Sequence, residues 1–296
     1  MIMIPYGKTH LTYDLSFNGL LTSRVDQLKS EKTGLELVET AMAAPIGSPK
    51  LSELAAGKKT CTIIISDHTR PVPSRDILPP MLAALRKGNP DIAITLLVAT
   101  GFHRLTTREE LVSKLGQEIA DSERIVIHDA FNADSNVQIG ILPSGAPLVI
   151  DRTAVETDLL IAEGFIEPHF FAGFSGGRKS VLPGIASRTT VLANHCSEFI
   201  AHPKARTGVL EGNPIHRDML WAAESAGLAY IVNVVLNGEK EAGVTIMLTD
   251  IGIDTGDMLR AKSVEIGELE TAGELTVRLS ELGAELLSET LPDYLE

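Results

Sequence analysis

Residues 163–195 contain the side chains of this sequence that are best suited to chemistry. The stretch includes His169, a glycine-rich turn at 175–177, Lys179 and His195. A glycine-rich turn lets backbone N–H groups approach a phosphate. A lysine beside a phosphate can neutralise it or bond covalently to the group that carries it, and histidines bind metal or move protons. These residue types together predict a phosphorylated cofactor held beside reacting atoms.

Two further loops carry candidate residues. The first, SDHTRPVP, contains Asp67, Thr69 and Arg70. It is either an ordinary Asp/Thr turn after a buried strand or an anion-binding loop in which the Arg70 guanidinium is the donor; His68 needs no role in either interpretation. The second loop, TGFHR, contains His103. A lone loop histidine is commonly structural, but His103 and His169 as a pair could serve as proton acceptor and donor at a stereocentre.

The glycine-rich turn does not fit the common nucleotide-binding motifs. GFSGGRKS matches neither GxxxxGK[ST] nor GxGxxG, which disfavours ATP binding and leaves a flexible turn as the alternative. His195 beside Cys196 can ligate a transition metal through its imidazole. A zinc site needs three or four protein ligands, and neither HExxH nor CxxC is present. If a metal binds, most of its ligands must come from something other than side chains. The remaining histidines are interpreted as surface or structural: His10, His128, His202 and His216.

Short β-branched runs alternate with helical segments along most of the chain. This alternation predicts an α/β fold with a doubly wound, mostly parallel, Rossmann-like sheet. Ligands of such sheets collect at the carboxyl ends of the strands. SDHTR, GFHR, HDA and EGFIEPH each follow a predicted strand, so we expect them to face one site. The predicted strands are 61–66, 92–100, 124–130, 148–151, 158–164 and 229–238, and the predicted helices are 76–88, 107–119 and 214–227.

Composition excludes several classes of protein. The 296 residues are 44% hydrophobic, enough to bury a substantial core. The formal net charge of -13 argues against a nucleic-acid partner. The two cysteines lack CxxC spacing, which favours a reducing compartment. No apolar run is long enough to span a bilayer, and the N-terminus does not look like a secretion signal. We therefore expect a cytoplasmic protein with no membrane partner.

The C-terminal part of the chain differs from the rest. From about residue 240 the pattern is irregular, and a closing helix is predicted from an amphipathic stripe formed by Leu275, Leu279, Leu282 and Leu286. A solvated packing helix is favoured over a helix that binds a partner. We expect a catalytic and cofactor-binding domain at 1–240. Residues 241–296 would form a divergent or truncated tail, irregular and helical, in place of a full second domain.

The motifs SDHTRPVPSR, GFHR, HDA, EPHFFAGFSGGRKSVLPG and NH, in this order, resemble the lactate racemase family, whose members use a nickel-pincer nucleotide. The resemblance extends from about residue 4 to about residue 238. It implies a nickel-bearing cofactor, pyridinium-3-thioamide-5-thiocarboxylic acid mononucleotide, covalently attached to Lys179, with His195 as the metal ligand. The cofactor would then supply the missing donors.

The resemblance also implies roles for the other candidates. His103 and His169 match the acid/base catalysts, and Arg70 would stabilise the substrate carboxylate or a developing oxyanion. The remaining matches contact the cofactor: Asp67 and Thr69 in the first loop, and Ser175, Gly176 and Gly177 at its phosphate.

The implied function is racemisation or epimerisation of a small 2-hydroxy acid such as lactate, by reversible hydride transfer to the nickel nucleotide. The implied partners are that substrate and the proteins that make the cofactor. Family members carry a second domain that has no match beyond about residue 240. The alternative is therefore a catalytically incomplete or truncated homologue that retains only the fold and cofactor binding. An ordinary nucleotide-dependent oxidoreductase is disfavoured because no dinucleotide fingerprint is present.

Overall fold

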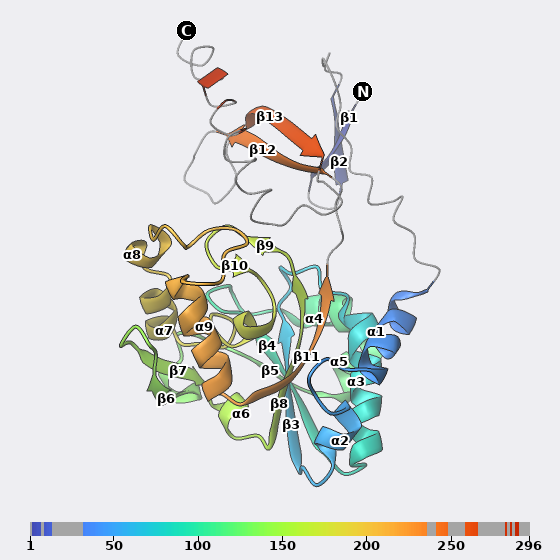
Figure 1. Cartoon of the computed structure of the whole chain (residues 1–296). Helices are drawn as coiled ribbons and strands as arrows, with labels where there is room; N and C mark the ends of the chain where they lie inside the picture. The colour runs from blue at the N-terminus through green and yellow to red at the C-terminus, as the bar shows by residue number, and fades with distance from the viewer. Residues whose placement is uncertain are drawn as a thin grey trace. The chain divides into compact units, whose positions relative to one another are not determined.

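The computed structural model describes residues 2–6, 9–13, 32–235, 241–247 and 258–265, together with Leu282, Glu285, Ser288 and Glu289. The chain divides into two compact units, Ser30–Leu236 and the combination of Met1–Lys29 with Asn237–Glu296 (Figure 1). Every candidate site residue belongs to the first unit. The predicted domain boundary at residue 240 stays a prediction.

The first unit is built on a five-stranded parallel sheet with the strand order β11-β8-β3-β4-β5. This arrangement confirms the predicted α/β class. The central strand is apolar on both faces: Ile63 and Ile65 pack into one core cluster, whereas Ile64 packs into the other. A strand buried on both faces must be continuously apolar. The strands are β3 (Thr60–Ser66), β4 (Ala93–Ala99), β5 (Arg124–Ile127), β8 (Leu159–Ile166) and β11 (Leu228–Val235).

Helices cover both faces of this sheet (Figure 1). One face is packed by α1 (Gly34–Ala43), α2 (Leu51–Ala55), α3 (Ser74–Gly88), α4 (Arg108–Leu115) and α5 (Gln117–Ser122). The other face is packed by α6 (Arg152–Val155), α7 (Arg188–Asn194), α8 (Ser197–Ile200), α9 (Pro214–Ser225) and a hairpin of β6 (Asn136–Ile141) with β7 (Pro147–Asp151). The fold is therefore three-layered, as predicted.

Two predicted elements differ in detail. The expected helix at 107–119 is two helices, because Gly116 has φ +88 and separates α4 from α5. The expected strand at 148–151 is β7, which pairs with β6 instead of joining the parallel sheet. Its apolar residues Leu148 and Ile150 still pack against the sheet, as part of the second core cluster. The short apolar, β-branched run revealed the strand but not its pairing partner.

The described strands of the second unit form two antiparallel pairs. Strand β1 (Ile2–Tyr6) pairs with β2 (Thr9–Tyr13), and β12 (Glu241–Met247) pairs with β13 (Met258–Glu265). Of the predicted closing helix, Leu282 is described and is buried. The other leucines of its stripe lie outside the described residues. Within the described part of the chain, no helix has the length and apolarity required to cross a membrane.

Candidate functional site

The site lies where the winding direction of the sheet reverses. From the central strand β3 the chain moves outward to β4 and β5, and it then returns to place β8 on the other side of β3. The loops that follow β3 and β8 diverge at this switch point, which is where open α/β sheets bind their ligands. The loop with Asp67 follows β3, and the loop with His169 follows β8. The predicted placement of both motifs at the carboxyl edge is confirmed.

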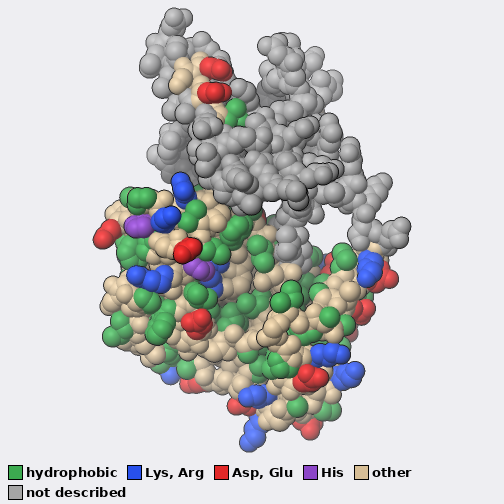
Figure 2. Space-filling model, viewed as in Figure 1, with side chains coloured by type: hydrophobic (Ala, Val, Ile, Leu, Met, Phe, Trp, Pro, Cys, Tyr) green, Lys and Arg blue, Asp and Glu red, His purple; other side chains and the backbone are tan. Residues whose placement is uncertain are grey.

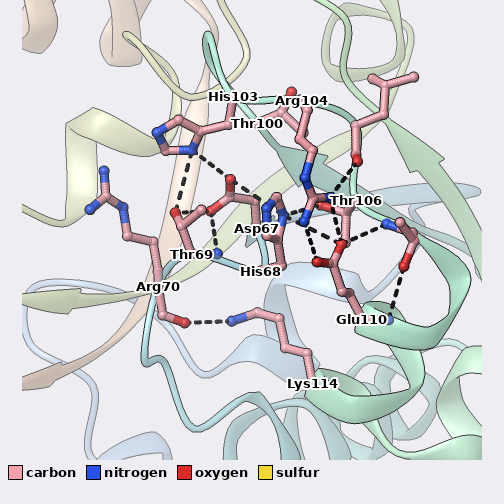
Figure 3. Close-up of polar contacts among 12 residues, drawn as sticks. Asp67, His68, Thr69, Arg70, Thr100, His103, Arg104, Thr106, Glu110 and Lys114 are labelled. Carbon is pink, nitrogen blue, oxygen red and sulfur yellow. Dashed lines mark hydrogen bonds and ion pairs between the residues drawn. The ribbon is translucent and has the colours of Figure 1, made fainter. Parts of the chain in front are cut away.

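The first group of side chains joins the loops after β3 and β4 (Figure 3). Asp67 is buried, and its Oδ2 lies 2.6 Å from His103 Nδ1. Its Oδ1 accepts from the Thr69 hydroxyl at 2.7 Å and from the Thr69 N–H at 3.2 Å. Burial alone would raise the pKa of Asp67, but hydrogen bonds from His103 and Thr69 leave this pKa below its ordinary value. Asp67 is therefore an ionised carboxylate that orients the His103 ring.

A surrounding network, which the sequence patterns did not single out, holds these loops (Figure 3). His68 Nδ1 lies 3.1 Å from the Thr106 hydroxyl and 3.8 Å from Glu110 Oε2. Arg104 pairs with both Glu110 oxygens, and Lys114 Nζ donates to the Arg70 carbonyl at 3.1 Å. The Thr107–Glu110 capping box that begins α4 was detectable from the spacing TREE. The ion pair across the loop was not, because it depends on how the chain turns.

The second group gathers after β8 and before α8. Phe171 lies edge-on to His169, with ring centroids 4.5 Å apart, and edge-on to His195 at 5.2 Å. Lys179 Nζ lies 5.9 Å from the centre of the same Phe171 ring. The charges of Lys179 and Arg70 both act on His169. The structure therefore brings His169, Lys179 and His195 around one aromatic ring, with Arg70 near enough to influence His169 and Lys179.

Burial sets the protonation of this second group. It lowers the pKa of Lys179 to about 7, and the neighbouring charges of Arg178 and Arg70 act in the same direction. Burial also lowers the pKa of His169 to about 3 and that of His195 to about 4, in each case with a further contribution from Lys179. At neutral pH both imidazoles are therefore neutral, and a large fraction of the Lys179 amine is the free base. A neutral amine is a nucleophile and a neutral imidazole is a metal ligand.

The glycine-rich turn is held by its own hydrogen bonds. The Ser175 hydroxyl accepts from the Glu167 N–H at 2.9 Å and donates to the Phe165 carbonyl at 3.2 Å. Gly176 has φ +76, and a Cβ on it would lie 2.5 Å from the Phe165 carbonyl oxygen. Arg178 donates to two backbone carbonyls of the same loop. The Ser175 side chain thus shapes the turn in this structure.

Replacing Gly176 by alanine should destabilise the protein by about 1–3 kcal/mol, because it adds a steric clash to an unfavourable φ. The matched control is Gly227→Ala, since Gly227 has φ +72 but no atom within 4 Å of an added Cβ. Urea unfolding of both variants measures the difference. Equal losses of unfolding free energy would show that the close approach to Phe165 is unimportant.

The structure confirms the interpretation of His128 as a structural residue, and the expectation that the HDA motif faces the site is wrong for this side chain. This ring is fully buried, with Nδ1 3.0 Å from Asp151 Oδ2 and Nε2 3.1 Å from the Ala186 carbonyl. Asp151 also accepts from the Thr153 N–H at 2.9 Å. Burial alone would raise the pKa of Asp151, but the hydrogen bonds from His128 and Thr153 hold it below its ordinary value. His128 is a structural residue that links β5, β7 and the segment before α7.

We expect His128→Ala to lower the unfolding free energy by about 3–5 kcal/mol at pH 7, because it leaves the Asp151 carboxylate buried without its main partner. The depressed pKa of Asp151 fixes the sign of the pH dependence. The stabilisation is fully present above the ordinary aspartate pKa of about 3.9 and is lost as the pH falls through the lower, folded-state pKa. Urea unfolding at several pH values should show the gap between wild type and variant narrowing in acid. Equal unfolding free energies of wild type and His128→Ala at pH 7 would contradict the structural role of His128.

Among the described residues, no group of three or more His, Cys, Asp and Glu side chains could by itself hold a metal ion. His195 nevertheless has a buried Nδ1 without a hydrogen-bond partner in the described part of the chain. The residues therefore fit a metal that enters with donors of its own and takes a single imidazole from the protein. They also fit a group that bonds to an amine, because the Lys179 amine and that imidazole both lie near the Phe171 ring.

The fold and its loops define an α/β protein of the kind that places its ligand at the carboxyl edge of a parallel sheet. Comparison with known proteins gives the family: the lactate racemase N-terminal domain matches residues 6–208. The lactate racemase of Thermoanaerobacterium thermosaccharolyticum is 55% identical over 243 residues, which cover 81% of this chain and 57% of that protein. The lactate racemase of Lactiplantibacillus plantarum is 52% identical over 266 residues, 89% of this chain and 61% of that protein. The chain belongs to the lactate racemase family.

A solved structure agrees with this result. The lactate racemase apoprotein of T. thermosaccharolyticum superposes with a TM-score of 0.71 and 46% identity, covering 98% of this chain and 62% of that one. A Thermotoga maritima protein with 23% identity and a TM-score of 0.57 shares the fold. The resemblance drawn from the motifs is confirmed. The chain spans about three fifths of the length of the curated racemases that it matches.

The C-terminal part has a different relationship, which the motifs did not reveal. Formyl transferase matches residues 215–291. The methionyl-tRNA formyltransferase of Alkaliphilus metalliredigens is 55% identical over 65 residues, which are 22% of this chain and 21% of that protein. The predicted divergent segment at 241–296 is therefore similar to part of another enzyme family.

Proposed function

We propose that the unit formed by residues 30–236 holds a nickel-bearing pyridinium mononucleotide and racemises or epimerises a small 2-hydroxy acid such as lactate. One observation carries this proposal: a half-buried, partly neutral lysine and a neutral histidine flank one aromatic ring at the switch point of the sheet. Membership of the lactate racemase family supports the assignment. Such a cofactor, when bound, supplies a carbon that accepts hydride and donors that hold nickel.

In this proposal each candidate residue binds the cofactor, the metal or the substrate. Lys179 provides the amine for covalent attachment, and His195 provides the imidazole for nickel. The planar Arg70 guanidinium binds the substrate carboxylate through paired N–H donors. His103 and His169 exchange a proton or a hydrogen bond with the substrate hydroxyl group. Gly176 and Gly177 offer backbone N–H groups to the cofactor phosphate, whereas the Ser175 N–H donates to the Glu167 carbonyl at 2.9 Å and holds the turn. Asp67 and Thr69 belong to a loop that contacts the cofactor and the substrate.

Arg70 supplies local positive charge for an anionic substrate in an otherwise acidic chain. The chain is acidic overall, with a net charge of -13. On the face drawn in Figure 2, acidic and basic side chains are interspersed over the described surface. A 2-hydroxy acid would meet Arg70, whose charge also acts on Lys179. Removing hydride instead of the Cα proton avoids a carbanion beside a carboxylate, so the protein's tasks are to position the carboxylate, accept the hydroxyl proton and exclude water.

The test is to co-express the chain with cofactor-making proteins, measure intact mass and nickel content, and assay both enantiomers of several 2-hydroxy acids. We expect a mass adduct, stoichiometric nickel and interconversion of one enantiomeric pair. An adduct with nickel but without interconversion would favour the second candidate, a homologue that retains the fold and cofactor but does not turn over. That candidate is supported by the match of residues 215–291 to formyl transferase. Absence of both adduct and nickel would refute both.

A further inference from the structure

The two histidines assigned to the hydroxyl group have chemically opposite partners at Nδ1. His103 Nδ1 faces Asp67 Oδ2 at 2.6 Å. The Asp67 carboxylate also accepts from the hydroxyl and N–H of Thr69, and its Oδ2 lies 3.9 Å from His68 Nδ1. A carboxylate accepts hydrogen bonds and does not donate them, so His103 must carry its proton on Nδ1. Its Nε2 then has a free lone pair, and the exposed fraction of its side chain is 41%.

His169 has the reverse arrangement. Its Nδ1 accepts from the backbone N–H of Ala172 at 3.2 Å and from that of Phe171 at 3.5 Å. A backbone N–H can only donate, so Nδ1 must have a lone pair and the proton must lie on Nε2. A second proton on Nδ1 would point at these N–H groups. Stacking of Phe170 on the ring, at 4.8 Å with an interplanar angle of 9°, and the edge of Phe171 hold this orientation.

Resting on the proposed function, we infer that His103 and His169 have different tasks. His103 takes the substrate hydroxyl proton on Nε2 and later returns it, whereas His169 stays neutral and donates a hydrogen bond from Nε2–H to the substrate oxygen. Asp67 is the positioning residue that makes His103 the acceptor. The backbone of Phe171 and Ala172 makes His169 the donor.

Atoms and electrons are conserved when the substrate loses its hydroxyl proton and its Cα hydride. The O–H bond breaks, its proton forms an N–H bond at His103 Nε2, and the resulting imidazolium is paired with the Asp67 carboxylate. The O–H electron pair forms the carbonyl as hydrogen leaves Cα with its own pair. A bound pyridinium cofactor of the proposed kind would accept that hydride, so its reduction would balance the oxidation of the 2-hydroxy acid to a 2-keto acid. The carbonyl oxygen accepts the hydrogen bond from His169, and return of hydride and proton restores every group.

The first experiment reads the tautomers directly in the cofactor-free protein. ¹⁵N-histidine NMR at a fixed neutral pH distinguishes ring nitrogens with a proton from those with a lone pair. Signals are assigned by their loss in His103→Gln and His169→Gln. We expect a protonated Nδ1 in His103 and a protonated Nε2 in His169. His202 is the internal reference, because its Nδ1 accepts from the Lys204 N–H at 3.1 Å. A protonated Nδ1 in His169 would overturn the inference.

The second experiment separates the two tasks in cofactor-loaded protein. Glutamine carries an amide N–H near the position of the imidazole Nε2, so it can replace a donor but not a base. We expect His169→Gln to retain turnover within about tenfold, and His103→Gln to lose about 10²–10⁴-fold, with nickel content unchanged in both. Equal losses would overturn the division of tasks. If wild type itself fails to racemise, the proposed function fails and the proton transfer at His103 fails with it, whereas the NMR result still decides the tautomers.

Discussion

Lys179→Ala is expected to abolish covalent cofactor attachment completely. In the proposed function the neutral Lys179 amine is the nucleophile, because burial together with the charges of Arg178 and Arg70 lowers its pKa to about 7. Lys179→Arg should fail equally, because a guanidinium keeps the positive charge but is always protonated. The measurement is the intact mass of protein purified after co-expression with cofactor-making proteins.

The matched control for this experiment is Lys87→Ala, which removes an exposed lysine in the last turn of α3. It should retain the full adduct. An undiminished adduct in Lys179→Ala would refute the assignment, and an adduct in Lys179→Arg but not in Lys179→Ala would mean that charge alone holds the cofactor. Nickel content measured on the same samples shows whether His195 holds metal without covalent attachment.

Asp67→Asn is expected to lower kcat by about 10²–10⁴-fold while nickel and the Lys179 adduct remain. An asparagine amide can donate to His103 Nδ1, which moves the ring proton to Nε2 and removes the base. The overall shape of the loop should survive, because the asparagine Oδ1 can still accept from Thr69. The measurement is steady-state racemisation by cofactor-loaded protein.

Asp91→Asn serves as the control, because this exposed aspartate lies between α3 and β4. It should have wild-type turnover. If Asp67→Asn also loses nickel, then Asp67 acts chiefly in cofactor binding, as the family resemblance implies. If its turnover stays within twofold of wild type, the contact of 2.6 Å between Asp67 and His103 does not govern the reaction.

The C-terminal similarity changes how this chain should be compared with full-length racemases. Residues 6–208 match the racemase N-terminal domain, and residues 215–291 match formyl transferase. The second match begins within the parallel-sheet unit, since it includes α9 and β11. An activity assay of this chain therefore tests whether the residues that match the racemase N-terminal domain catalyse racemisation when a formyl-transferase-like segment follows them.

The sequence alone was sufficient for the layer architecture and for placing the candidate loops at the carboxyl edge of the sheet. A continuously apolar strand such as 61–66 leaves the water only when both of its faces are buried, and helices on each side of a parallel sheet bury them. Polar motifs that follow such strands must lie at one edge. The family followed from long motifs around His169 and Lys179, because their order and spacing are local properties of the chain.

Tertiary structure decided which side chains meet and in what state. Glu110 and Lys114 reach the loops of His68 and Arg70 only because α4 folds back beside them. His128 follows a strand as His103 follows another, yet it is buried against Asp151, because β7 pairs with β6 at that position. The neutral amine of Lys179 and the opposite tautomers of the two site histidines depend on burial and on partners distant in sequence or set by loop geometry. Spacing along the chain carries no information about these quantities, because desolvation and hydrogen bonding arise only once the loops have packed.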